Sequence, residues 1–144
     1  MSNIENSKSN KLKLVREISI KADSPEFREN SKMLGEKASK IFSEKAQIKK
    51  LENTANFALK VTDIYNYIKR QTGKDTKGKN WRSQEFGSGL LKSLEELENN
   101  DGKDICKNLD ISSPAEKMQV NLLLAREFIR QLVVHYEYET RGKK

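Results

Sequence analysis

The chain is poor in cysteine, histidine, proline and glycine. Cys106 is the only cysteine and His135 the only histidine among 144 residues. A single cysteine excludes an intramolecular disulfide, and a His/Cys zinc site needs more ligands than this chain offers. We therefore expect no metal and no other cofactor. The two prolines, the seven glycines and the scarcity of alternating Val, Ile and Thr favour helix over sheet.

Long apolar runs are also missing. The first residues, "MSNIENSKSNKLKLV", contain no apolar core of signal-peptide length. No other stretch is long and apolar enough to cross a bilayer. We therefore expect a cytoplasmic protein with no membrane partner.

No group of residues has the pattern of a catalytic site. No nucleophile accompanies His135 as a triad requires, so we expect this side chain to be packed at or near the core. Glu95 and Glu96 are neighbours on a predicted helix and point about 100° apart, so they do not converge as an acid and a base. The glycines of "FGSGLL" follow no strand and precede no Lys-Ser/Thr pair, which favours a closely packed helix start over a phosphate loop. The chain is not expected to be an enzyme.

Helix-forming sequence is abundant. The length suits one domain, and we expect an all-α fold: a compact bundle of about four to five helices over 24–144, with a flexible basic N-terminal arm over 1–23. The segment "KLKLVREISI" in that arm also alternates like a short strand, but no second strand exists to pair with it. Apolar spacings of three and four predict helices near 25–42, 45–71, 83–99 and 114–140.

Two of these helices have distinctive patterns. The helix 45–71 has two adjacent apolar stripes, the second of which contains Phe57, and we expect Gly73 to follow its C-terminus. The helix 114–140 is the most hydrophobic and is predicted to be the central core helix. Ser113, Pro114 and Glu116 form a capping-box pattern at its start.

The formal net charge of +7 is unevenly distributed. Residues 69–82 have a local charge of +5, because Asp75 is the only acid among six basic residues: Lys69, Arg70, Lys74, Lys77, Lys79 and Arg82. Residues 83–110 have seven acids against three lysines, a local charge of −4. The basic segment suggests a polyanion partner and the acidic one a basic protein neighbour. The alternative is that both are solvated surface.

The basic segment is typical of sequence-nonspecific RNA binding. Each lysine or arginine that neutralises a phosphate releases counterions, which gives affinity without base reading. A flexible loop with glycines suits such contacts. Trp81 has two interpretations: it stacks on an exposed base, or it anchors its helix in the core. The pairs Tyr65/Tyr67 and Tyr136/Tyr138 each place one ring inward and one near the surface.

Two stretches resemble a known family. The sequences "AQIKKLENTANFALKVTDIYNYIKRQTG" and "LAREFIRQLVVHYEYETRGKK" are similar to the opening and closing helices of the small subunits of type III CRISPR effector complexes. The resemblance implies a non-catalytic subunit that stacks with copies of itself and with other subunits and contacts RNA through basic residues. "WRSQEFGSGLLKSLEEL" has no counterpart there.

Three functions are therefore compared. The first is a structural subunit of an RNA-guided ribonucleoprotein in antiviral defence. The second is a helical protein-interaction adaptor or regulator with no nucleic-acid role. A DNA-binding regulator ranks last, because no compact helix-turn-helix precedes an exposed recognition helix.

Overall fold

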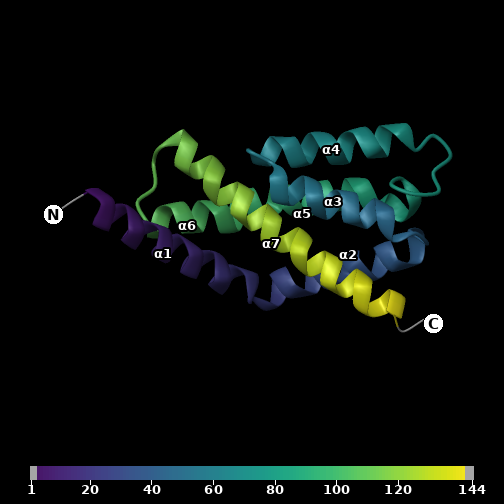
Figure 1. The fold of residues 1–144 in the computed structure, drawn as a ribbon, viewed down its shortest axis with the longest axis horizontal. Helices are drawn as coiled ribbons and strands as arrows, with labels where there is room; N and C mark the ends of the chain where they lie inside the picture. The colour runs from purple at the N-terminus through teal and green to yellow at the C-terminus, as the bar shows by residue number, and fades with distance from the viewer. Residues whose placement is uncertain (1–2, 142–144) are drawn as a thin grey trace.

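The regular structure is helical throughout the part of the chain that the computed structural model describes, residues 3–141 for the backbone and 10–140 for the side chains. The α-helices in order are α1 (Asn3–Ala22), α2 (Pro25–Ile41), α3 (Lys45–Phe57), α4 (Val61–Lys74), α5 (Phe86–Leu97), α6 (Lys103–Asn108) and α7 (Pro114–Arg141). A 3₁₀ turn, η1 (Ser83–Glu85), precedes α5, and a π-helical turn, η2 (Glu98–Gly102), joins α5 to α6. The all-α prediction is confirmed (Figure 1). No helix within 3–141 has a stretch apolar and long enough to span a membrane.

Helix α7 is the central element. It crosses the molecule, and every other α-helix contacts it (Figure 1). Its inward side chains Leu122, Ile129 and Leu132 are buried, as predicted. The Oγ of Ser113 accepts a hydrogen bond from the N–H of Glu116 at 3.4 Å, so the predicted cap is present.

The most extensive helix–helix contact is that of α2 with α7. Gly35 makes it possible, because a Cβ at this position would lie 2.6 Å from the carbonyl oxygen of Leu132 and 2.7 Å from the Cβ of His135. Glycine generally weakens a helix interior, but Gly35 has a packing role. The structure shows that its missing side chain sets the distance between α2 and α7.

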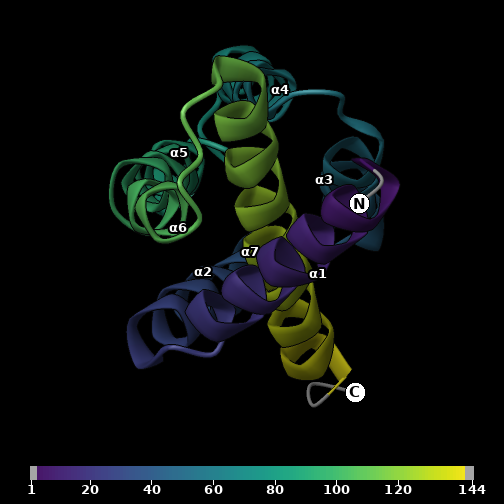
Figure 2. The same cartoon turned by 90° about the vertical axis from the view of Figure 1, so that its left-hand side faces the viewer.

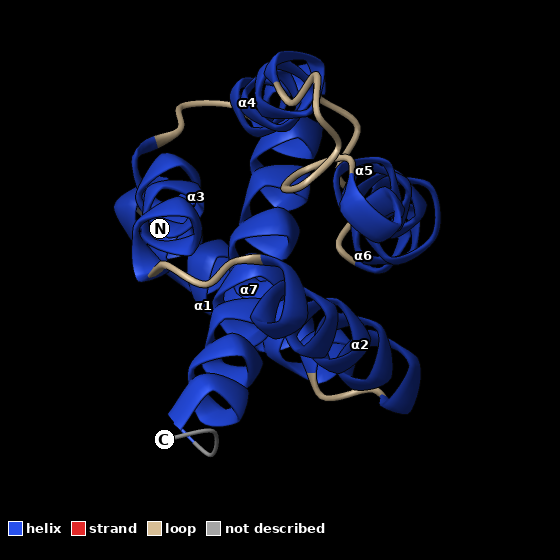
Figure 3. Ribbon diagram, turned by 90° about the vertical axis from the view of Figure 1, so that its right-hand side faces the viewer, coloured by secondary structure: helices blue, strands red, loops and turns tan. Residues whose placement is uncertain are grey.

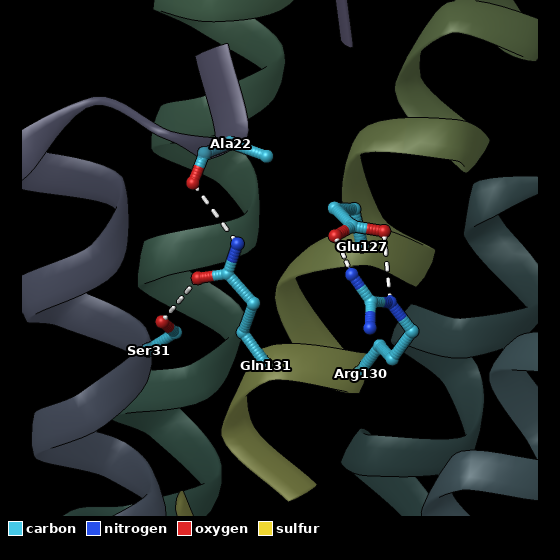
Figure 4. Close-up of polar contacts among 5 residues, drawn as sticks. All are labelled: Ala22, Ser31, Glu127, Arg130 and Gln131. Atoms are coloured by element: carbon cyan, nitrogen blue, oxygen red, sulfur yellow. Dashed lines mark hydrogen bonds and ion pairs between the residues drawn. The ribbon is translucent and has the colours of Figure 1, made fainter. Parts of the chain in front are cut away.

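A buried polar network joins three helices (Figure 4). The Nε2 of Gln131 on α7 donates to the carbonyl of Ala22 at the end of α1, at 2.9 Å. The hydroxyl of Ser31 on α2 donates to the Oε1 of Gln131 at 3.0 Å. Ser31 is fully buried, so the network satisfies a polar group that would otherwise be costly in the core.

The N-terminal segment is a helix where a flexible arm was predicted. Ile18 and Ala22 of α1 belong to the buried core, and Leu14 packs against it. These three residues are spaced by four, which is one face of a helix and explains why the strand alternative also fails. Helix α1 crosses α7 (Figure 2), and Lys21 forms a 3.2 Å ion pair with Asp104 of α6.

The predicted helix 45–71 is two helices. Helices α3 and α4 meet at a corner over residues 58–60, with Ala58 and Lys60 in extended conformations. Phe57 was predicted to lie in a buried stripe, but its side chain is 80% exposed. This break and the helix α1 together explain why there are more helices than the four to five predicted.

Candidate nucleic-acid interface

The seven predicted contact residues, six basic residues and Trp81, lie at one end of the molecule, on the last turns of α4 and the loop that follows. Side chains of all six basic residues are exposed: Lys69, Arg70, Lys74, Lys77, Lys79 and Arg82. Helix α4 continues through Gly73 to Lys74, so the predicted end near Gln71 is wrong by one turn. The glycine with a left-handed conformation is instead Gly78, in the loop, with φ of 68°.

Asp75 organises the loop. Its carboxylate accepts hydrogen bonds from the backbone N–H groups of Asn80 and Arg82, both at 2.9 Å, and of Lys79 at 3.3 Å. These bonds, first that from Arg82, hold the pKa of Asp75 below its ordinary value. The loop is therefore folded around one acid and is not the flexible tether that its composition suggested. The carboxylate of Asp75, the only acid of the basic segment, binds backbone N–H groups. The lysine side chains of the segment therefore point to solvent.

Arg82 closes the loop onto the helix. Its Nε donates to the carbonyl of Thr72 at 2.8 Å, near the C-terminus of α4. A cation at this position also suits the negative end of the helix dipole. Arg82 therefore also stabilises the loop through this hydrogen bond. None of the four ion pairs described among residues 10–140 includes any of the six basic residues.

Trp81 belongs to the core. The residue is 2% exposed, and its Nε1 donates to the Oε1 of Gln47 on α3 at 3.3 Å. Its ring packs against Phe42, Phe86 and Tyr67, with centroids 5.5, 5.4 and 6.0 Å apart. The stacking role proposed for Trp81 is wrong in this fold, because no face of the indole is available to a base. Its role is to anchor the loop that carries the lysines.

The start of α5 packs tightly under this loop. A side chain on Gly87 would collide with the hydroxyl of Thr72, and it would lie 3.1 Å from the carbonyl of Trp81. The close-packing interpretation of "FGSGLL" is therefore confirmed. Glu95 and Glu96, later on the same helix, are exposed.

The pair Tyr136/Tyr138 divides as predicted, and the pair Tyr65/Tyr67 does so only in part, because the hydroxyl of Tyr67 is also buried. Tyr65 and Tyr136 are buried, Tyr67 is half-buried and Tyr138 is exposed. The hydroxyl of Tyr65 donates to the Oε2 of Glu98 at 2.7 Å. Burial first, and then this carboxylate, raise the pKa of Tyr65 well above its ordinary value.

Some acids of the segment 83–110 form contacts within the chain. Glu98 accepts from Tyr65, and Asp104 pairs with Lys21. Asp101 is half-buried, and burial raises the pKa of its carboxyl. These contacts reduce the acidic surface that a basic neighbour could use. Within the described residues, no three His, Cys, Asp or Glu side chains are grouped as metal ligands.

The basic surface is wider than the sequence analysis recognised. The ends of α2 and α4, the start of α3 and the loop meet at the same end of the molecule (Figure 3), and the Nζ of Lys37 on α2 donates to the carbonyl of Gln84 at 3.2 Å. Residues 37–82, which also include the corner at the other end of α4, hold twelve basic residues against four acids, a local charge of +8 that exceeds the +7 of the whole chain. A charge count over this longer window would have revealed it.

Comparisons with protein-family models, with curated proteins and with solved structures found no match to this chain.

Proposed function

We propose that this chain is a non-catalytic, RNA-binding structural subunit of a ribonucleoprotein. One observation carries the proposal: the net positive charge of the chain is concentrated in residues 37–82. Six basic side chains of this segment are exposed on the last turns of α4 and on the following loop. The carboxylate of Asp75 holds that loop in place. Such a surface attracts a phosphate backbone through counterion release and reads no sequence. The resemblance of two stretches to type III CRISPR small subunits supports the same assignment, in which neighbouring subunits, including further copies, cover other faces.

The test is a charge reversal at positions that do not hold the loop. Lys69, Arg70, Lys74 and Lys79 are changed together to glutamate, while Asp75 and Arg82 are left in place because they organise the backbone. Binding of labelled single-stranded RNA is then measured by anisotropy, with the chain alone and in its assembled complex. We expect binding to be lost and the circular dichroism spectrum to be unchanged.

A matched control separates a local surface from overall charge. Lys92, Lys103, Lys107 and Lys117 are exposed, lie in or next to the acidic segment, and give the same change in net charge when all four become glutamate. This variant is expected to keep most of its RNA affinity. For the native chain, log affinity should fall linearly with log salt, with a slope of about −0.7 per phosphate contacted on a single strand. If the first variant binds RNA as well as the native chain, the adaptor function replaces the RNA-binding one.

A further inference from the structure

The corner between α3 and α4 presents two large apolar side chains to solvent. Phe57 is 80% exposed and Leu59 is 89% exposed, more than any other large apolar side chain with a described position. Between them, Ala58 is buried. The corner therefore turns one small residue into the core and holds the two large ones outside it.

This exposure belongs to a fixed backbone. The guanidinium of Arg126 on α7 donates to the carbonyls of Ala55 and Ala58, at 2.9 and 2.7 Å. The N–H of Leu59 donates to the Oδ2 of Asp63 at 3.2 Å, and the N–H of Ala58 to the carbonyl of Thr54 at 2.9 Å. The carbonyls of Ala55 and Ala58 and the N–H groups of Ala58 and Leu59 therefore all have hydrogen-bond partners. This hydrogen-bonded backbone fixes the ring of Phe57 outside the core.

The surroundings of the corner are basic. Lys60 follows Leu59 directly and is exposed, and Lys50 lies two turns before Phe57 on the same side of α3. Of the two nearest acids, Asp63 accepts from the corner itself and Glu52 pairs with Lys49 at 3.3 Å. Exposed lysines therefore both precede and follow the two apolar side chains in the sequence.

Helix α4 connects this corner to the basic loop. Its 14 residues run from the corner at Val61 to the loop after Lys74 (Figure 1), a length of about 21 Å. An exposed aromatic ring thus stands at one end of α4 and a group of exposed cations at the other. Single strands are typically bound by this combination, a charged groove or edge for the backbone and an aromatic ring for a base.

We infer that Phe57 is a base-stacking residue and that the RNA bound by this chain is single-stranded. This inference rests on the proposed function and names its ligand: the backbone runs from the lysines beside the corner to the exposed cations at the other end of α4, and an unstacked base lies on the Phe57 ring with Leu59 beside it. A duplex has no free base face to offer, so it is the poorer ligand. The role that the sequence suggested for Trp81 is thereby assigned to an exposed ring at the other end of the same helix.

The experiment compares two single-stranded ligands of equal length and charge, an oligouridylate and an abasic ribose-phosphate oligomer. Base stacking contributes about 1–3 kcal/mol per base, and 1.4 kcal/mol is tenfold in affinity. Phe57→Ala should therefore weaken oligouridylate binding about 5- to 150-fold and leave the abasic oligomer unaffected. Phe57→Trp should restore the affinity, and Phe57→Leu, which keeps an apolar side chain without an aromatic face, should not.

Four outcomes decide between the inference and its rivals. If Phe57→Ala weakens the binding of both ligands equally, base stacking is overturned, because the change then acts on contacts with the RNA backbone. If Phe57→Ala binds RNA as well as the native chain but the fourfold lysine and arginine reversal does not bind it, base stacking is overturned. The proposed function then still stands. If the native chain binds neither ligand, alone or assembled, both fall. If Phe57→Ala leaves RNA affinity unchanged but dissociates the chain from its complex in sedimentation, the corner is a protein contact and the inference is wrong.

Discussion

Arg126 of α7 closes the C-terminal end of α3, with its Nε 2.9 Å from the carbonyl oxygen of Ala55 and an Nη 2.7 Å from that of Ala58. The last carbonyls of a helix have no partner within the helix, and a planar guanidinium can bind two of them at once. These hydrogen bonds join residues 71 and 68 positions apart in the chain. The place where α3 ends is therefore set by a side chain from the last helix.

Replacing Arg126 by methionine should destabilise the fold by about 1.5–3 kcal/mol, because two half-buried hydrogen bonds to a charged group are lost. Urea unfolding followed by circular dichroism measures the change. Arg130→Met is the control, since Arg130 is exposed and pairs only with Glu127 one turn away; the expected loss is about 0–1 kcal/mol. Equal losses in the two variants would mean that Arg126 does not hold the corner.

Gly35→Ala should destabilise the protein by about 1–3 kcal/mol. The added methyl group meets α7 at the carbonyl of Leu132 and the Cβ of His135, and neither can move without shifting the helix. Gly73→Ala is the matched control. Gly73 is also helical, and nothing lies within 4 Å of an added Cβ, so alanine there should be neutral or stabilising by about 0.4–1 kcal/mol. The melting temperature should fall for Gly35→Ala and stay the same or rise for Gly73→Ala; an unchanged or raised melting temperature for Gly35→Ala would show that α2 and α7 can separate without cost.

Elements that depend on local pattern were predictable. The start of α7 followed from Ser113 and Pro114, and its buried face from the spacing of apolar residues. Helix α1 was missed because its apolar residues also alternate like those of a strand, although Leu14, Ile18 and Ala22 do lie on one helical face. Packing against α7 supplies the stability that local propensity does not.

Features that depend on distant partners were not predictable in the same way. The apolar stripes of 45–71 continue through Ala58, so the apolar pattern marks no break; Arg126, from the far end of the chain, makes the corner together with the nearby Asp63. The start of the basic loop was predicted to within one helical turn, but its order comes from one acid, Asp75, that looked like a minor correction to the charge. Trp81 was assigned two roles because sequence alone does not show which ring faces the core.

Asp75→Asn should loosen the loop without unfolding the bundle. The loss of charge weakens the bonds to the N–H groups of Asn80 and Arg82, so hydrogen exchange at these two amides should become faster at neutral pH. The native chain should behave in the same way in acid. Because the folded pKa of Asp75 is lower than its ordinary 3.8, its contribution is fully present above that pH and is lost as pH falls through the lower, folded value.

Protection factors for the two amides, followed by NMR from neutral to acidic pH, test this assignment. Glu96→Gln, which removes an exposed carboxylate from α5, is the control and should leave both amides protected. Equal protection in Asp75→Asn and the native chain would show that the loop is held by Trp81 and Arg82 alone.

The fluorescence of Trp81 distinguishes a core residue from a nucleic-acid contact in the native chain. Trp81 is the only tryptophan, and it is buried among aromatic rings beside Gln47. We expect the emission of Trp81 to be blue-shifted. RNA should not quench it, even at an RNA concentration that anisotropy shows to saturate binding. Quenching in proportion to bound RNA would instead place a base against the indole and require the loop to open. Trp81→Ala should cost about 3–5 kcal/mol of stability, so any loss of RNA binding in that variant must be assessed together with its unfolding. The native emission is free of that ambiguity, which makes it the decisive measurement for this residue.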